Sequence, residues 1–267
     1  MSFDRFRAQR VCEGFLGCLN LDDWWRADFK NFSLSKTNAS TFNNALKEDA
    51  NDLFYKGLIS LSECINSFAN RQYSWAVVKG YYSVFYMLKA DLALKEIGLI
   101  RHKSIYYLEA KEGARPITKG AKGVHRAKYV SDHKATINYY VDFFNGTDIL
   151  LTQNIHELTS YEWLMEKREQ INYRERTFNE PLFPDFLSYI DSEIHASNFK
   201  SLIKEIINDT FVKTFQPEYA ALAIPIKRAI LTRQSFTKSG IAFNIQEDKL
   251  KYAQALISIK IEELMND

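Results

Sequence analysis

The stretch WAVVKGYYSVFYMLKADLALKEIG, residues 75–98, is apolar on nearly every side of a helical projection. Because a helix that is apolar all round belongs inside a protein, residues 73–98 predict the central helix of a bundle. Ala76 and Gly80 are four residues apart and leave room for another helix to approach closely, and Gly98 is a predicted C-cap. The apolar positions of one stripe are Trp75, Val78, Tyr82 and Phe85.

The preceding segment, residues 41–70, has the pattern of an amphipathic helix. Its apolar residues recur at intervals of three, four or seven, which places them on one face. Asn38 and Ser40 are the predicted N-caps. Only residues 69–71 separate this helix from the next, so the two form an antiparallel helical hairpin.

The helical pattern of apolar residues ends after residue 98. Residues 104–110 and 114–120 flank a KEG turn and predict a small β-hairpin or an irregular insertion. A helix capped by Ser131 or Asp132 then runs to residue 144, and a second one, capped by Thr159 or Ser160, covers 161–176. The segment EPLFP, residues 180–184, ends it. Further helices are predicted over 185–194, 199–211, 219–234 with Pro225 at its start or in a kink, and 247–265, with a turn and a short strand over 238–246.

These patterns predict a mainly α protein: an antiparallel helical bundle with a small β-hairpin or irregular insertion and a C-terminal helical extension. Residues 1–36 form an N-terminal segment, 37–180 the bundle with a basic insertion at 101–130, and 181–267 the C-terminal helical region. The two larger parts either form separate units or share one core. No repeat of 20 to 50 residues is present in the sequence.

The composition of the 267 residues is that of a soluble globular protein, with 46% hydrophobic and 25% charged residues. No apolar run approaches the roughly 18 residues of a membrane span, and charges interrupt the N-terminus, so we expect a cytoplasmic protein that does not contact membranes. Cys12, Cys18 and Cys64 are expected to be reduced and mostly buried. Neither the cysteines nor the isolated His156 and His195 have ligand spacing, so no metal or other cofactor is predicted. Motifs for nucleotide triphosphates, dinucleotides and serine hydrolases are missing from the sequence.

Charge is distributed unevenly along the chain. The overall net charge is +2, yet residues 101–134 contain nine Lys and Arg against three Asp and Glu, a net charge of +6. They also hold three of the five histidines and three of the ten glycines. A concentrated positive field beside exposed amides favours a phosphate ligand. The alternative is a solvated surface loop.

Two strings together resemble HEPN-domain proteins. Residues 75–98, with their tyrosine-rich YYSVF patch, resemble the long central helix of that superfamily, and residues 163–178, WLMEKREQINYRERTF, resemble its last core helix. With the helix over 41–70, the resemblance covers residues 40–180. It implies a HEPN-like bundle that forms a homodimer, binds RNA and cuts it without metal, in a toxin–antitoxin or phage-defence system.

The resemblance also implies a site of the form Arg, four to six residues, His. Arg126 and His133 fit this form and would serve as the phosphate clamp and the proton-transfer residue of RNA cleavage. Here Ala127 follows the arginine, where active members have a polar residue. The alternative is that His133 is an exposed first-turn residue and Arg126 a loop charge.

Other residues are candidates for binding RNA. Arg168 and Asn172 are four apart, so on a continuous helix they share a face and could contact phosphate. Alternatively, Arg168 and Glu169 are buried polar anchors that orient their helix. The basic residues expected at the RNA are Lys119, Lys122, Lys128 and Lys134.

Three classes of function remain open from the sequence. The first is a metal-independent endoribonuclease of a toxin or phage-defence system. The second is a non-catalytic HEPN-like subunit that binds RNA or a partner protein, such as an antitoxin or another defence component. The third is a structural assembly protein, which the 14% of aromatic residues would suit.

Overall fold

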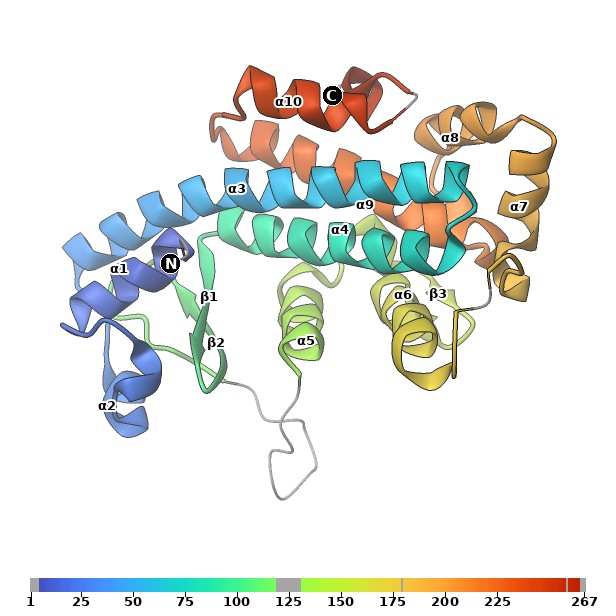
Figure 1. The fold of residues 1–267 in the computed structure, drawn as a ribbon. Coiled ribbons are helices and arrows are strands. Elements are labelled where there is room, and N and C mark those ends of the chain that lie inside the picture. Colours follow the sequence, from blue (N-terminus) through green and yellow to red (C-terminus); the bar gives the residue numbers. More distant parts are fainter. Residues whose placement is uncertain (1–4, 119–130, 179, 258, 265–267) are drawn as a thin grey trace.

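The computed structural model describes residues 5–118, 131–178, 180–257 and 259–264, and it is mainly α as predicted. Two long antiparallel helices, α3 and α4, lie side by side through the middle of the molecule (Figure 1). The N-terminal helices and a β-hairpin lie at one end of this pair, and α6, α7 and α8 at the other. The helices are α1 (Arg7–Phe15), α2 (Arg26–Asn31), α3 (Lys36–Ala69), α4 (Tyr73–Leu94), α5 (Asp132–Phe144), α6 (Ser160–Glu169), α7 (Ser188–His195), α8 (Phe199–Asn208), α9 (Pro217–Ser239) and α10 (Glu247–Ala255).

The predicted helical hairpin is confirmed, but its first helix begins earlier than expected. Ser35 is the N-cap of α3 and accepts a hydrogen bond from the amide of Asn38, so Asn38 and Ser40, the predicted caps, lie inside the helix. The turn into α4 is made at Arg71, whose φ of 57° reverses the chain direction.

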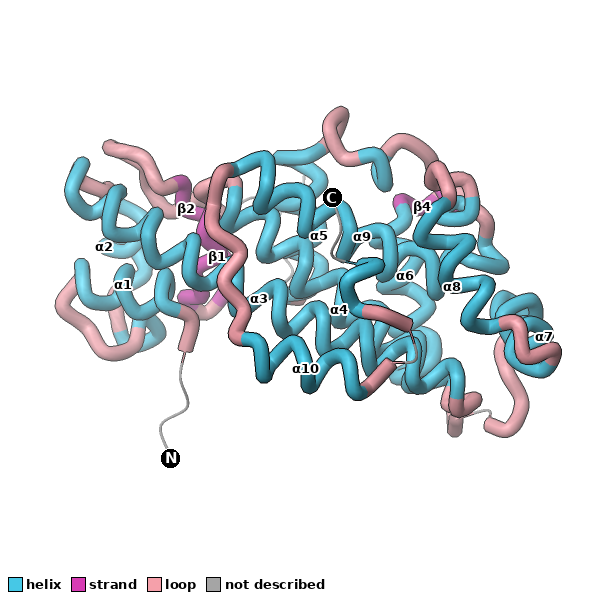
Figure 2. Tube along the Cα trace, turned by 90° about the horizontal axis from the view of Figure 1, so that it is seen from above, coloured by secondary structure: helices cyan, strands magenta, loops and turns pink. Residues whose placement is uncertain are grey.

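The third long helix of the core, α9, comes from the far end of the sequence. It packs against both α3 and α4 and follows the direction of α4 (Figures 1 and 2). A Cβ on Gly80 would lie 3.1 Å from the Cys64 sulfur and 3.2 Å from Cγ of Pro225, so this glycine allows the close approach predicted for it. Pro225 lies within α9, which begins at Pro217 rather than near Tyr219.

The strands differ from the prediction. The hairpin pairs β1 (Ile97–His102) with β2 (Ser104–Glu109) around Lys103, while residues 114–117 contribute one bridge, from Ile117 to Tyr107. Gly98 is therefore not a helix cap: α4 ends at Leu94, and Gly98 lies in β1, where a side chain would collide with Phe42. The apolar pattern of residues 75–98 continues from α4 into β1, so periodicity alone does not show where the helix ends and the strand begins.

Two helices project from the same side of α4. Helix α5 has the predicted bounds and the predicted cap Ser131, and α6 begins at a capping box made by Thr159. The prediction for α6 was too long, because the α-helix ends at Glu169 and becomes a π turn over Gln170–Arg174. A second short hairpin pairs β3 (Asn154–Ile155) with β4 (Leu158–Thr159) just before α6.

Towards the C-terminus the predicted helices are present, but α8 and α10 are shorter than predicted and α9 is longer. Helix α8 ends at Asn208, and α10 ends at Ala255, after which Ile261–Leu264 form a 3-10 turn. The chain before α10 forms no strand: Gly240 ends α9 in the left-handed conformation and residues 241–246 are irregular.

A buried ion network joins α9 to α4 and to the segment after α5. The guanidinium of Arg228 lies 2.9 Å from Asp91 of α4 and 2.8 Å from Asp148, which follows α5. Tyr140 and Tyr161 complete it through their hydroxyls, 2.8 and 3.0 Å from the guanidinium. Burial opposes the charge of Arg228, but the two carboxylates outweigh it and raise its pKa well above the ordinary value. The network therefore acts as an internal cross-link between segments far apart in sequence.

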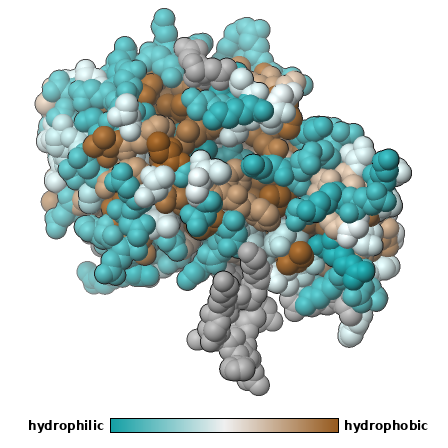
Figure 3. Space-filling model, turned by 180° about the vertical axis from the view of Figure 1, so that it is seen from behind, coloured by the Kyte–Doolittle hydropathy of each residue, from teal (hydrophilic) through white to brown (hydrophobic). Residues whose placement is uncertain are grey.

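No helix among the described residues is long and apolar enough to cross a membrane. Seen from the side opposite to Figure 1, apolar side chains gather across the middle of the surface between hydrophilic margins (Figure 3).

Candidate functional site

His133 lies at the start of α5 and turns its ring toward α4. The Ser131 hydroxyl accepts a hydrogen bond from the Lys134 amide, which fixes the first turn of the helix. Nδ1 of His133 lies 2.9 Å from the Tyr81 hydroxyl, and the ring centroid is 4.5 Å from that of Phe85. His133 is thus half-buried and held in place, rather than an exposed first-turn residue.

This environment keeps His133 neutral. Burial is the largest cause that lowers its pKa below the ordinary 6.5, and the positive charge of Arg168 lowers it further. No described residue forms a hydrogen bond with Nε2. In the tautomer whose proton lies on Nδ1 and is donated to the Tyr81 hydroxyl, the Nε2 lone pair can accept a proton at neutral pH.

The lowered pKa of His133 predicts a pH dependence of stability. Below pH 6.5 the unfolded chain binds a proton that folded His133 resists, so the free energy of unfolding falls as the pH drops from 6.5 through the folded-state pKa. Urea unfolding of wild type and His133→Gln at pH 7.5 and 5.5 measures this. We expect the variant to lose less stability than wild type on acidification, and equal losses would contradict the assignment.

Arg168 is a buried cation without a carboxylate partner. Only 5% of the residue is exposed, and no described Asp or Glu lies within ion-pair distance of it. Its guanidinium lies over the rings of Tyr81, Tyr82 and Tyr173, and Nη2 donates to the hydroxyls of Tyr173 at 3.1 Å and Tyr82 at 3.4 Å. The Nε atom has no hydrogen-bond partner. Buried charges are ordinarily paired, so this guanidinium retains donor capacity for an anion.

The π turn after α6 determines which side chain contacts the guanidinium of Arg168. It places Tyr173, five residues on, against the guanidinium, whereas Asn172 is half-buried and forms no hydrogen bond with Arg168. The predicted sharing of a face by Arg168 and Asn172 assumed a continuous α-helix, which ends at Glu169. Tyr173 is 71% exposed and covers the outer side of Arg168.

Aromatic and basic side chains follow the outer face of α4 away from this cluster. They recur every three or four residues and are partly or largely exposed. Lys56 of α3 lies over Tyr86, and Phe178 packs against Trp75. We call this set the α4 stripe; it consists of Trp75, Lys79, Tyr82, Tyr86 and Lys89.

The other predicted site residues are only partly placed. Lys134 is exposed, next to His133. Arg126 and three of the predicted RNA-binding lysines lie outside the described residues, so the pairing of Arg126 with His133 stays a prediction. Those lysines are Lys119, Lys122 and Lys128.

Sequence reasoning missed the role of the tyrosines. The run YYSVFY, residues 81–86, was assigned to the bundle core, yet Tyr81 and Tyr82 contact both His133 and Arg168. The sequence did contain an indication of this role: three tyrosines lie within residues 81–86, and buried tyrosine hydroxyls usually have hydrogen-bond partners.

His133 of α5 and Arg168 of α6 thus meet on the tyrosine-rich side of α4, the central helix of the bundle. The HEPN domain family matches residues 50–148, from the middle of α3 to just beyond the end of α5. This match supports membership of the HEPN superfamily for residues 50–148. The string at 163–178 lies beyond the matched residues. No curated protein and no solved structure matches the chain.

Proposed function

We propose that this protein binds RNA on the α4 stripe and cleaves it beside His133 without a metal ion. The observation that carries the proposal is the convergence of a neutral imidazole and an unpaired, desolvated guanidinium on the aromatic side of α4. Aromatic rings stack on bases, and lysines contact the backbone, in proteins that bind single-stranded RNA.

The chemistry assigns one step to each group. Nε2 of His133 takes the proton of a ribose 2′-hydroxyl, whose oxygen attacks the adjacent phosphorus. The bond from phosphorus to the 5′ oxygen breaks, leaving a 2′,3′-cyclic phosphate, and a proton from water completes the 5′-hydroxyl. Arg168 and Arg126 bind the phosphate oxygens as charge builds up on them.

Incubation of RNA with the protein in EDTA tests this function. Wild type should cleave it, Arg126→Ala should not, and Arg168→Gln should bind it more weakly and with a smaller salt dependence. Arg174→Gln, an exposed arginine just beyond Arg168, is the matched control and should behave as wild type. Salt-sensitive binding without cleavage would leave the second candidate, a non-catalytic RNA-binding subunit.

We propose, as HEPN domains suggest, that the protein acts as a homodimer in a toxin or phage-defence system, with an antitoxin or defence protein as partner. Light scattering on the purified protein tests the dimer: a mass of twice 31.1 kDa is expected. A single-chain mass would overturn it. If the protein neither binds nor cleaves RNA, the result would favour a partner-assembly protein.

A further inference from the structure

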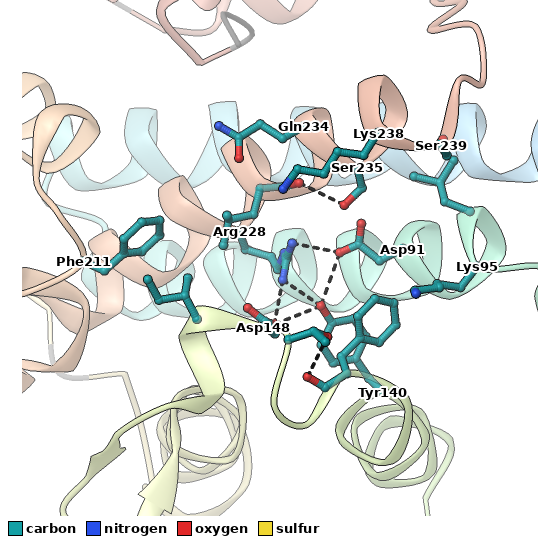
Figure 4. Close-up of a pocket in the computed structure, with 15 residues that line it drawn as sticks. Asp91, Lys95, Tyr140, Asp148, Phe211, Arg228, Gln234, Ser235, Lys238 and Ser239 are labelled. Atoms are coloured by element: carbon teal, nitrogen blue, oxygen red, sulfur yellow. Dashed lines mark hydrogen bonds and ion pairs between the residues drawn. The ribbon is translucent and has the colours of Figure 1, made fainter.

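Lys89 of α4 is a half-buried cation without a carboxylate partner. By contrast, the buried guanidinium of Arg228 lies between two carboxylates (Figure 4). Lys89 forms no ion pair and no hydrogen bond with a described residue. Aromatic rings face it instead, because its Nζ lies 4.7 Å from the ring centroid of Phe6 and 5.6 Å from that of Phe85. Ring faces replace only part of the hydration that an ammonium group loses on burial.

A second lysine lies beside the same phenyl ring. Nζ of Lys56, on α3, is also 4.7 Å from the ring centroid of Phe6, so the two nitrogens lie within twice that distance of each other. Lys56 is exposed and likewise has no ion-pair partner among the described residues. Two like charges at this range disfavour each other, and burial makes Lys89 the one that loses its proton more easily.

The carboxylates near Lys89 have other partners. Asp49 of α3 accepts hydrogen bonds from two backbone amides at the start of α1, each at 2.8 Å. Asp132, at the start of α5, binds the guanidinium of Arg101 at 2.6 Å. The hydrogen bonds to Asp49 also fix the position of Phe6, the residue that precedes α1. The two lysines and the ring between these helices are therefore a defined cluster without a counter-charge of its own.

This cluster makes a neutral amine available near neutral pH. Burial is the largest cause that lowers the pKa of Lys89 to about 8, and the charge of Lys56 lowers it further, whereas Asp132 and Asp49 raise it. His133, on α5, also lies near Lys89 and is neutral. A substantial fraction of Lys89 is thus the free amine at pH 7.5, while an ordinary lysine with a pKa of about 10.4 is almost wholly charged.

The amine of Lys89 is accessible to a small reagent. Its Nζ is not one of the side-chain atoms that lack both a hydrogen-bond partner and contact with solvent. A lysine that is desolvated beside another cation is activated as a nucleophile. The neighbouring ammonium group of Lys56 remains charged and favours an electrophile that carries an anionic group such as phosphate.

We propose that Lys89 is a modification site that accepts an acyl group from an acyl phosphate. The neutral amine attacks the carbonyl carbon, and the bond between that carbon and the phosphate oxygen breaks. Inorganic phosphate leaves with the electron pair of this bond, beside the ammonium group of Lys56, and the nitrogen gives a proton to water. The product is a neutral amide, so acylation removes one positive charge from the α4 stripe. The reaction does not depend on RNA cleavage.

Incubation of the wild-type chain with acetyl phosphate, followed by mass spectrometry of its peptides, tests the proposal. At pH 7.5 Lys89 should be acetylated at least about tenfold faster than Lys200, an exposed lysine of α8. The rate at Lys89 should level off above about pH 8, whereas the rate at Lys200 should keep rising about tenfold per pH unit. A rate at Lys89 no higher than at Lys200, or parallel pH profiles, would overturn the proposal.

A variant of Lys56 tests its part in the reaction. Lys56→Gln removes the neighbouring charge, so the pKa of Lys89 should rise and acetylation of Lys89 at pH 7.5 should slow by about three- to tenfold. Lys200→Gln is the matched control and should leave the rate at Lys89 unchanged. Equal rates in Lys56→Gln and wild type would overturn the role of Lys56.

A comparison of reagents tests the class of acyl donor. Inorganic phosphate should compete with acetyl phosphate for Lys89 in wild type and much less in Lys56→Gln, because the anion binds beside Lys56. Acetic anhydride, which carries no phosphate, should also acetylate Lys89 before Lys200 but without inhibition by phosphate. Preference for Lys89 with the anhydride alone would overturn acyl phosphate as the donor.

Discussion

Substituting His133 with alanine should lower the rate of RNA cleavage by about 10²–10⁴-fold, the contribution of a positioned general base. The reason is that Nε2 of the neutral imidazole is the proton acceptor of the proposed reaction, and alanine leaves no group to replace it. Binding of RNA should change much less, because the α4 stripe and Arg168 remain. Single-turnover cleavage in EDTA, with RNA in a gel shift at the same salt, separates the two effects.

Two controls distinguish a catalytic His133 from a structural one. His156→Ala removes an exposed histidine of another segment and should leave the rate unchanged. Tyr81→Phe removes the hydroxyl that holds Nδ1 but keeps the ring, so it should reduce the rate less than the loss of His133 does.

The pH profile adds a further test of His133. Because the pKa of His133 is lowered, wild-type activity should decline only below about pH 6.5. Undiminished cleavage by His133→Ala would contradict the role.

The second large effect is on stability, at Arg228. Arg228→Ala should reduce the free energy of unfolding by about 3–5 kcal/mol, because it leaves two buried carboxylates, Asp91 and Asp148, without their cation. Total stabilities of about 5–15 kcal/mol make this a large fraction, so chemical denaturation of the variant should begin at low denaturant concentrations. Lys238→Ala, on the exposed face of the same helix, should stay within about 0.5 kcal/mol of wild type.

Acidification should partly rescue the Arg228 variant. Burial already raises the pKa of Asp91, and loss of the guanidinium raises it further. A carboxyl whose pKa is raised in the folded state stabilises the fold at pH values below that pKa, so the deficit of Arg228→Ala should shrink as the pH falls. The triple variant Arg228→Met, Asp91→Asn, Asp148→Asn should recover much of the stability at pH 7. A small loss of unfolding free energy in Arg228→Ala would show that the Arg228 network contributes little to stability.

The fold could be predicted from the sequence wherever a long apolar period was present. The pair α3 and α4 and the bounds of α5 follow from periodicity and caps, which are local signals. The partner of β2 could not be predicted, because β1 continues the apolar run of α4 without a break. The π turn after Glu169 could not be predicted either, since its residues are compatible with an α-helix.

The candidate site was predictable only in part. His133 and Arg168 were singled out as separate candidates, one on each of two helices, and their convergence depends on how α5 and α6 pack against α4. The unpaired state of Arg168 is likewise a property of packing: Glu169 is its neighbour in sequence but pairs with Arg174.

The position of α9 in the chain has a consequence for synthesis on the ribosome. Thr232 follows its partner Asp91 by 141 residues, which at about 5–20 residues per second take roughly 7–28 s to translate. During that time α3 and α4 are complete, while the surface around Gly80 that α9 covers and the carboxylate of Asp91 still lack their partners. The nascent hairpin therefore exposes to the cell the surface that α9 later covers, and the core is completed only after most of the chain has been made.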